Sequence, residues 1–247
     1  MWIQHLIDIT IQSHLRGDDG PVVTVRINPA GAEFTFPKHL LANRSSYFAE
    51  MFDGLSGEGN QTATLEEREG ILSVQSFELL LAFLRRGKFT LPHTSIEHDI
   101  SALIELARFI DMCKITGADD LIAKMLRTII FIMSNVGPGP GVSTEANTKY
   151  LTSQHIRSAV HLPTGHPVRS VMAGASVMGY IYEKNYKFIK ETHEVPSFAA
   201  DLLVEVRKTF AGVKIDEYFQ LYVKDPIFID ENSPRLIPYA CLHSLTR

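Results

Sequence analysis

The sequence has few cysteines, no long hydrophobic segment and no excess of positive charge. Cys113 and Cys241 are the only cysteines among 247 residues, which is too few for a disulfide framework. The longest apolar run is Leu79–Leu84, whereas a membrane-spanning helix needs about 20 apolar residues. Lys and Arg number 24 against 28 Asp and Glu, which argues against a protein that binds mainly nucleic-acid phosphates. We therefore expect neither a membrane nor a nucleic acid as partner.

The first residues, 1–8, lack both a basic region and a continuous apolar stretch. Such a start is not typical of a secretory signal peptide. Two isolated cysteines are also typical of a reducing compartment. We therefore expect a cytoplasmic or nuclear protein.

Motifs for catalysis and for cofactor binding are scarce as well. No glycine-rich phosphate-binding motif is present. The segments 174–179 and 54–59 resemble the turn that carries a nucleophilic serine, but both are one residue too long. The spacing of His155, His161 and His166 does not place two metal ligands on one helical face, and surface histidines explain them better. We expect a protein that is not an enzyme, with no catalytic residue, metal, cofactor or small-molecule substrate.

The first part of the chain predicts strands followed by helices. Residues 22–27 are β-branched and 32–36 alternate, which favours two strands of a hairpin. Helical periodicity begins at Lys38, and Ser45 is expected to cap a second helix. A short third strand is expected at 62–65. This order of elements is that of an α+β fold.

Three longer helices are predicted next. The first runs from about Ser73 to Arg86 and ends at Gly87. The second opens at 94–97, which fits a capping box beginning with Thr94. Asp119 is expected to cap the third. Cys113 lies among apolar residues and is expected to behave as a small hydrophobic side chain.

The clearest break in the chain is at 135–147, where alternating Gly and Pro cannot continue a helix. We therefore predict a folded domain at 20–135, a linker at 136–149 and a mostly helical region of unknown role at 150–247.

Two features of this C-terminal region can be tested against a structure. Ser153 is expected to cap a short helix that runs through Val160. Pro196 and Ser197 are expected to open a longer helix. Its buried face is expected to hold Phe198, Leu202, Leu203, Val206 and Phe210.

Several blocks of the first half, taken in order, resemble the BTB/POZ family. Residues 34–48 are similar to its signature of an aromatic strand end, two leucines and Arg-Ser-x-Tyr/Phe-Phe. Residues 77–84 resemble the family's next helix, although Arg85 stands where a Tyr is usual. Residues 106–121 are similar to the helix and turn that follow. Together the blocks cover about 22–134.

Two details are similar to fungal members of that family. Pro37-Lys38 stands where His-Lys often stands, and 163–170 resembles a segment common downstream of fungal BTB domains. The resemblance implies a BTB/POZ, Skp1-like fold with a small sheet flanked by helices. It further implies a non-catalytic interaction module, a scaffold or adaptor that self-associates or recruits partner proteins.

The resemblance also implies two binding segments. In many BTB domains the stretch before the first core strand crosses to a partner subunit, so Trp2, Ile3, Leu6 and Ile7 are candidates for a homodimer interface. The alternative, that they cover the core of their own chain, stays open.

Some BTB domains recruit cullin-3 through a hydrophobic-x-Glu motif, to which Ser56, Gly57 and Glu58 correspond here. Ser56 replaces the hydrophobic anchor, whose full burial would contribute about 1.5–3 kcal/mol. A substrate adaptor of a cullin-3 ubiquitin ligase is therefore the alternative function. A transcriptional regulator, for which no zinc-finger spacing is present, and a hydrolase are further alternatives.

Overall fold

The structure is a computed structural model that describes residues 20–54, 61–91, 94–134, 148–182, 187–211, 214–215, 221–224 and 236–237. The chain divides into two compact units, 1–90 with 109–116 and 91–108 with 117–247. The division into 20–135, 136–149 and 150–247 stays a prediction, since most of the proposed linker lies outside the described residues.

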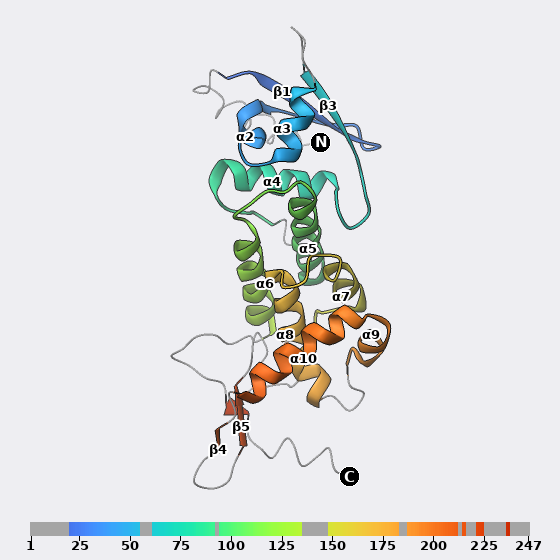
Figure 1. Ribbon diagram of the computed structural model, residues 1–247, viewed down its shortest axis with the longest axis vertical. Helices are drawn as coiled ribbons and strands as arrows, with labels where there is room; N and C mark the ends of the chain where they lie inside the picture. The colour runs from blue at the N-terminus through green and yellow to red at the C-terminus, as the bar shows by residue number, and fades with distance from the viewer. Residues whose placement is uncertain are drawn as a thin grey trace. The chain divides into compact units, whose positions relative to one another are not determined.

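The first unit contains a three-stranded sheet (Figure 1). β1 (Val22–Asn28) lies in the middle, antiparallel to β2 (Ala32–Pro37) and parallel to β3 (Gln61–Glu66). The hairpin between β1 and β2 turns at Gly31, whose φ of 69° is a conformation that favours glycine. The three predicted strands and the α+β class are confirmed.

One face of this sheet is apolar and buried. The alternation of strand side chains places Val23, Val25 and Ile27 of β1 on that face, with Phe34 and Phe36 of β2. Phe77 packs on both β2 aromatics, with ring centroids 5.1 Å from Phe34 and 6.2 Å from Phe36. The hydrophobic core of the first unit therefore forms against a single sheet face.

Three helices of the first unit lie where the sequence predicts helices. α2 (Lys38–Ala42) and α3 (Ser46–Asp53) follow β2 directly, and α4 (Val74–Arg86) begins after the Ser73 cap. The N–H of Ser76 donates to the Ser73 hydroxyl, and Gly87 ends α4 in the left-handed conformation. The expected bounds of this helix are confirmed.

The next two helices begin near the expected residues, but their caps differ. α5 (Ile96–Met112) is capped by Ser95, which accepts a hydrogen bond from the N–H of His98, so the prediction of Thr94 was wrong by one residue. Serine and threonine are both favourable N-cap residues, and the backbone path selects Ser95 here. Asp119 is the first residue of α6 (Asp119–Ser134).

The second unit continues with α7 (Ser153–Ala159), α8 (Pro167–Tyr182), α9 (Ile189–Glu194) and α10 (Pro196–Ala211). α8 contacts α6, α7 and α10, so it forms the middle of this unit (Figure 1). Thr152 caps α7 by accepting from the N–H of His155, which corrects the expectation of Ser153.

The polarity of α10 differs from the prediction. Phe198 and Leu202 are buried as expected, whereas Leu203 is 69% exposed and Phe210 is 48% exposed. Glu205 and Thr209 also lie on the buried face, and their polar atoms are bonded within the helix: Lys208 donates to the Glu205 carboxylate, and the Thr209 hydroxyl donates to the Glu205 carbonyl.

The C-terminal part holds three short strands, β4 (Lys214–Ile215), β5 (Leu221–Lys224) and β6 (Leu236–Ile237), in the order β4-β5-β6. The sequence did not predict them, since strands of two to four residues show little periodicity. Within the described ranges, no helix has the length and apolar character needed to cross a membrane.

We predict that Ser45→Ala lowers the free energy of unfolding by about 1–3 kcal/mol. The Ser45 hydroxyl accepts from the N–H of Phe48 at 3.1 Å and donates to the Cys113 carbonyl at 2.5 Å, and both bonds are buried. Urea unfolding followed by circular dichroism measures the change. Ser46→Ala, at the exposed neighbouring position, is the matched control. Equal stability of the two variants would contradict the proposed role of the cap.

Candidate interaction surfaces

The residues predicted to bind partners lie outside the described part of the structure. Trp2, Ile3, Leu6 and Ile7 precede it, and Ser56, Gly57 and Glu58 belong to the interval 55–60. The two assignments therefore stay predictions. The described residues that flank these segments show what surface is presented beside each of them.

The exposed face of the sheet is polar and internally paired. The hydroxyls of Thr24 and Thr35 lie 3.1 Å apart across the hairpin, and Arg26 Nε donates to Glu33 Oε1 at 2.7 Å. Cross-strand pairs of this kind stabilise a solvated sheet face. Val22, the first residue of β1, is 49% exposed and adds one apolar side chain to this face.

An ion pair fixes the end of α3 where the chain enters the interval that contains Ser56. Lys38 Nζ lies 3.0 Å from Asp53 Oδ1 and donates to the Phe52 carbonyl at 3.4 Å. A cation is favourable at this point because the last carbonyls of a helix carry partial negative charge. The exit of α3 is thereby tied to the first residue of α2.

Cys113 is buried and has no features of a reactive thiol. Burial raises the pKa of its thiol to about 12, which keeps it protonated at neutral pH. Its carbonyl accepts the Ser45 hydrogen bond. The expectation of a small hydrophobic side chain is confirmed.

His155 joins α7 to α5 inside the second unit. Its Nδ1 accepts the N–H of Thr152 at 3.2 Å, so the proton of the neutral ring resides on Nε2. Nε2 lies 3.1 Å from the Glu97 carbonyl and 2.9 Å from the Ser101 hydroxyl. Burial lowers the pKa of His155, while the hydrogen bond to Glu97 opposes that shift.

A second contact joins the same two helices. Arg108 Nη1 donates to the Ser158 hydroxyl at 3.1 Å, one turn beyond His155. Burial lowers the pKa of Arg108, and the Glu105 charge opposes this. Polar contacts at both ends of α7 therefore fix its position along α5.

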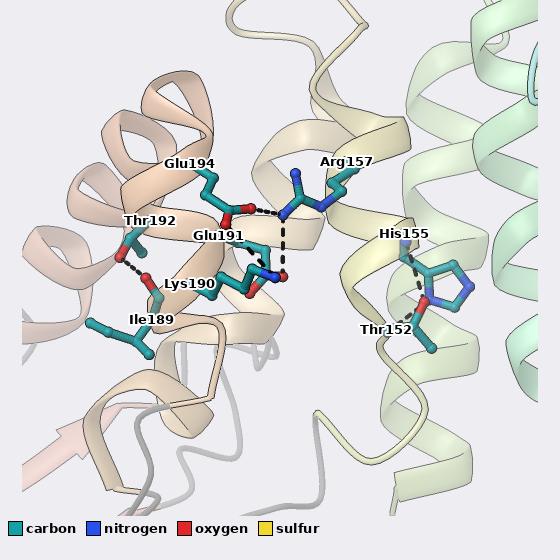
Figure 2. A network of polar contacts seen from close by, with 8 residues as sticks. All are labelled: Thr152, His155, Arg157, Ile189, Lys190, Glu191, Thr192 and Glu194. Atoms are coloured by element: carbon teal, nitrogen blue, oxygen red, sulfur yellow. Dashed lines mark hydrogen bonds and ion pairs between the residues drawn. The ribbon is translucent and has the colours of Figure 1, made fainter.

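Arg157 connects α7 to α9 on the other side of this helix (Figure 2). Its guanidinium is paired with Glu194 and lies 3.8 Å from the buried carboxylate of Glu191. The hydrogen bond from Arg157 lowers the pKa of Glu194. Lys190 adds a second cation 3.8 Å from Glu194. Figure 2 shows these groups together with the Thr152–His155 capping pair.

Arg169 is the most extensively bonded charged side chain described in the second unit. It is 5% exposed, and its Nε donates to Asp201 of α10 at 2.7 Å. Its Nη atoms donate to the carbonyls of Leu162 at 2.9 Å and Ser197 at 3.3 Å. Removing one partner of such a buried pair typically costs about 3–5 kcal/mol, so Arg169 ties α8 and α10 together.

His166, three residues before Arg169, is also buried. Its Nδ1 accepts the N–H of Val168 at 3.2 Å, and its Nε2 lies 3.4 Å from Asp119 of α6. The expectation that the histidines are surface residues is wrong for His155 and His166, which are only 3% and 8% exposed. His161 is exposed.

The serine of the 174–179 segment is not placed for catalysis. Ser176 is fully buried in α8, and its hydroxyl donates to the Met172 carbonyl at 2.8 Å. A nucleophilic serine would instead lie at an exposed turn. No three His, Cys, Asp or Glu side chains within the described ranges are grouped to hold a metal ion.

Sequence reasoning did not identify Arg169 or His155 as structural residues. The pattern of residues 163–170 indicates only a family likeness. An arginine inside an otherwise apolar helical stretch was the available signal, since buried arginines are almost always paired. Their partners, Asp201 and Glu97, lie 32 and 58 residues away, and nothing in a local pattern identifies them.

Comparison with known protein families identifies the first part of the chain. Residues 18–122 match the family model described as BTB/POZ domain. The matched range includes β1 to β3, α2 to α5 and the beginning of α6. No curated protein matches the chain.

We predict that acidification destabilises the protein through His155. Its folded-state pKa lies below the unfolded value of about 6.5, so its contribution is complete above that pH and is lost as the pH falls. Glutamine can also accept the capping hydrogen bond, so His155→Gln should show a smaller fall in Tm between pH 7.5 and 5.5. Differential scanning calorimetry measures this difference. His161→Gln, at an exposed position, should keep the wild-type pH dependence. An identical fall in wild type and His155→Gln would exclude His155 as the cause.

Proposed function

We propose that the chain is a non-catalytic scaffold that forms a homodimer through the BTB/POZ domain matched by residues 18–122. The family match is the observation that carries this proposal. BTB domains mediate protein–protein interaction and oligomerisation, and the described three-stranded sheet with its helices agrees with the α+β fold expected of the family.

The proposed dimer interface is the apolar N-terminal segment with Trp2, Ile3, Leu6 and Ile7. The exposed Val22 supports this proposal, because it places an apolar side chain at the end of β1 that the segment enters. In a two-fold dimer each segment would cover the same surface of the other subunit. The alternative is that the segment covers the core of its own chain.

We predict that the intact chain, with a monomer mass of 27.7 kDa, has about twice that mass in solution. Deletion of residues 2–15 should yield a monomer, because it removes the apolar surface that the two subunits bury. Light scattering across a dilution series measures the mass. Leu6→Asp should act like the deletion, whereas Gln4→Asp adds the same charge at a polar position and should leave the dimer intact.

Two results would contradict this mechanism. A dimer that persists after the deletion would assign residues 2–15 to the core of their own chain. A wild-type monomer at every concentration would exclude self-association, and the BTB domain would then serve a different protein.

A substrate adaptor of a cullin-3 ligase is the second proposal, based on the resemblance at Ser56, Gly57 and Glu58. The contacts of Lys38 with Asp53 and Phe52 support it, because they hold the point where the chain enters this segment. The C-terminal helices would then carry the substrate. The missing hydrophobic anchor at Ser56 predicts weak binding.

We predict that Ser56→Leu strengthens binding to purified cullin-3 roughly 10- to 100-fold, since burial of the added side chain contributes about 1.5–3 kcal/mol. Glu58→Ala should weaken it. Isothermal titration calorimetry measures both effects. Thr62→Leu, at an exposed position on β3, adds the same bulk outside the motif and should have no effect. Absence of binding by the wild type and by Ser56→Leu would exclude the adaptor function.

The remaining expectations stay proposals. The proposal of cytoplasmic or nuclear localisation rests on the two isolated cysteines. The fungal likeness rests on Pro37-Lys38 and 163–170. No observation in the described residues favours a transcriptional regulator, and Ser176, the candidate nucleophile of a hydrolase, is buried inside a helix.

A further inference from the structure

α10 presents three large apolar side chains to solvent, although its inner face already buries Phe198 and Leu202. Leu203, Val204 and Phe210 are 69%, 52% and 48% exposed. Glu205 and Thr209, on the opposite face, are buried. A helix that only covers its own core normally has polar or charged side chains on the side that faces solvent. The exposed side chains therefore need an explanation beyond the packing of this unit.

The exposed residues form one continuous stripe. Leu203 and Phe210 are seven residues apart and lie on the same side of the helix, two turns from each other. Val204 and Arg207 lie between them and are also exposed. We call Leu203, Val204, Arg207 and Phe210 the α10 outer stripe. Its spacing is the one with which a second amphipathic helix can pack.

An ion pair between α10 and α8 fixes the rotation of α10 about its own axis. Asp201 accepts the Nε–H of Arg169 of α8 at 2.7 Å. Rotation of α10 to bury Leu203 would remove Asp201 from the buried Arg169, which is costly. The stripe is therefore presented to solvent by a fixed helix.

The charges around the stripe are positive. Arg207 forms no ion pair with any described residue, and the Lys208 side chain is 60% exposed beside it, bonded to Glu205 at 2.6 Å. The acidic groups of the helix face inward, with Asp201 19% and Glu205 10% exposed. The outer face thus combines three exposed apolar side chains with Arg207 between them and Lys208 beside them, although the chain as a whole has a net charge of −4.

We propose that the α10 outer stripe docks an acidic amphipathic helix of another protein. Apolar side chains of that helix would pack on Leu203, Val204 and Phe210, and its carboxylates would face Arg207 and Lys208. Complementary charge of this kind selects partners and fixes the register of docking. This surface belongs to α10, outside the matched BTB range, and its function is independent of homodimer formation.

Charge also argues against two other occupants. A second copy of α10 would bring Arg207 and Lys208 against the same cations of its partner, which is unfavourable. A membrane-surface helix has a polar face rich in Lys and Arg, whereas α10 exposes only Arg207 and Lys208 beside the apolar side chains, and Lys208 is bonded to Glu205. Two exposed cations provide only about 1 kcal/mol each at an anionic bilayer.

The test uses the full chain and two synthetic 16-residue peptides with leucines at positions 3, 6, 10 and 13. One peptide has mainly Glu at the other positions, and the second has Lys in place of each Glu. Fluorescence anisotropy should show saturable binding of the Glu peptide alone. Leu203→Ser and Phe210→Ser should each weaken it by about tenfold or more, as expected for central apolar anchors. Arg207→Glu should shift the preference toward the Lys peptide.

Val22→Ser, at an exposed apolar position of the first unit, is the matched control and should bind the Glu peptide like the wild type. Val22 adjoins the proposed dimer segment in the sequence. If Val22→Ser no longer forms the dimer but still binds the Glu peptide, dimer formation and peptide binding are separate functions. A thermal melt of each variant checks its fold, and Lys190→Glu, at an exposed residue of α9, controls for charge reversal.

Four results would overturn the proposal. The first is a wild type that binds neither peptide, or both equally. A lower solution mass of Leu203→Ser would identify a second copy as the occupant. Leu203-dependent binding to vesicles of phosphatidylcholine and phosphatidylserine, without peptide binding, would identify a membrane. A large fall in the Tm of Leu203→Ser would show that the stripe packs on its own chain.

Discussion

The apolar face of the three-stranded sheet must be covered, and the first unit is organised by the side chain that covers it. Phe77 of α4 packs on Phe34 and Phe36 of β2, and also on Phe109, whose ring centroid is 6.1 Å away. A sheet this small cannot bury its apolar face without such a partner. The Ser45 bond to the Cys113 carbonyl then fixes the chain segment after Phe109 to the start of α3. One aromatic side chain and one buried hydroxyl thus determine how distant segments meet.

Local chemistry explains which parts of the fold were predictable. Ser45 and Ser73 cap helices, and Gly87 ends one, because the required geometry depends on only three or four neighbouring residues. Where two capping residues are adjacent, as Thr152 and Ser153 are, the local pattern does not decide between them. Elements with strong periodicity were therefore placed correctly, while their first residues were uncertain by one position.

Burial of polar side chains depends on partners that no local pattern reveals. His155 is neutral and buried because the Glu97 carbonyl and the Thr152 N–H satisfy its two ring nitrogens. Arg169 is buried because Asp201 and two carbonyls bind its guanidinium. Sequence periodicity assigns such residues to the surface, since an unpaired charge in the interior is strongly unfavourable. Periodicity also predicted that Leu203 is buried, whereas the structure shows it exposed.

The errors on α10 have a common physical origin. Asp201 is bonded to the buried Arg169, and this bond fixes which side of α10 faces α8. Glu205 and Thr209 lie on the same side and are buried. Leu203 and Phe210 are then exposed as a consequence, with Arg207 between them. The polar network that holds the helix therefore also creates the apolar and basic surface opposite to it. A scaffold whose BTB domain joins subunits would gain a second binding surface from these exposed side chains of α10.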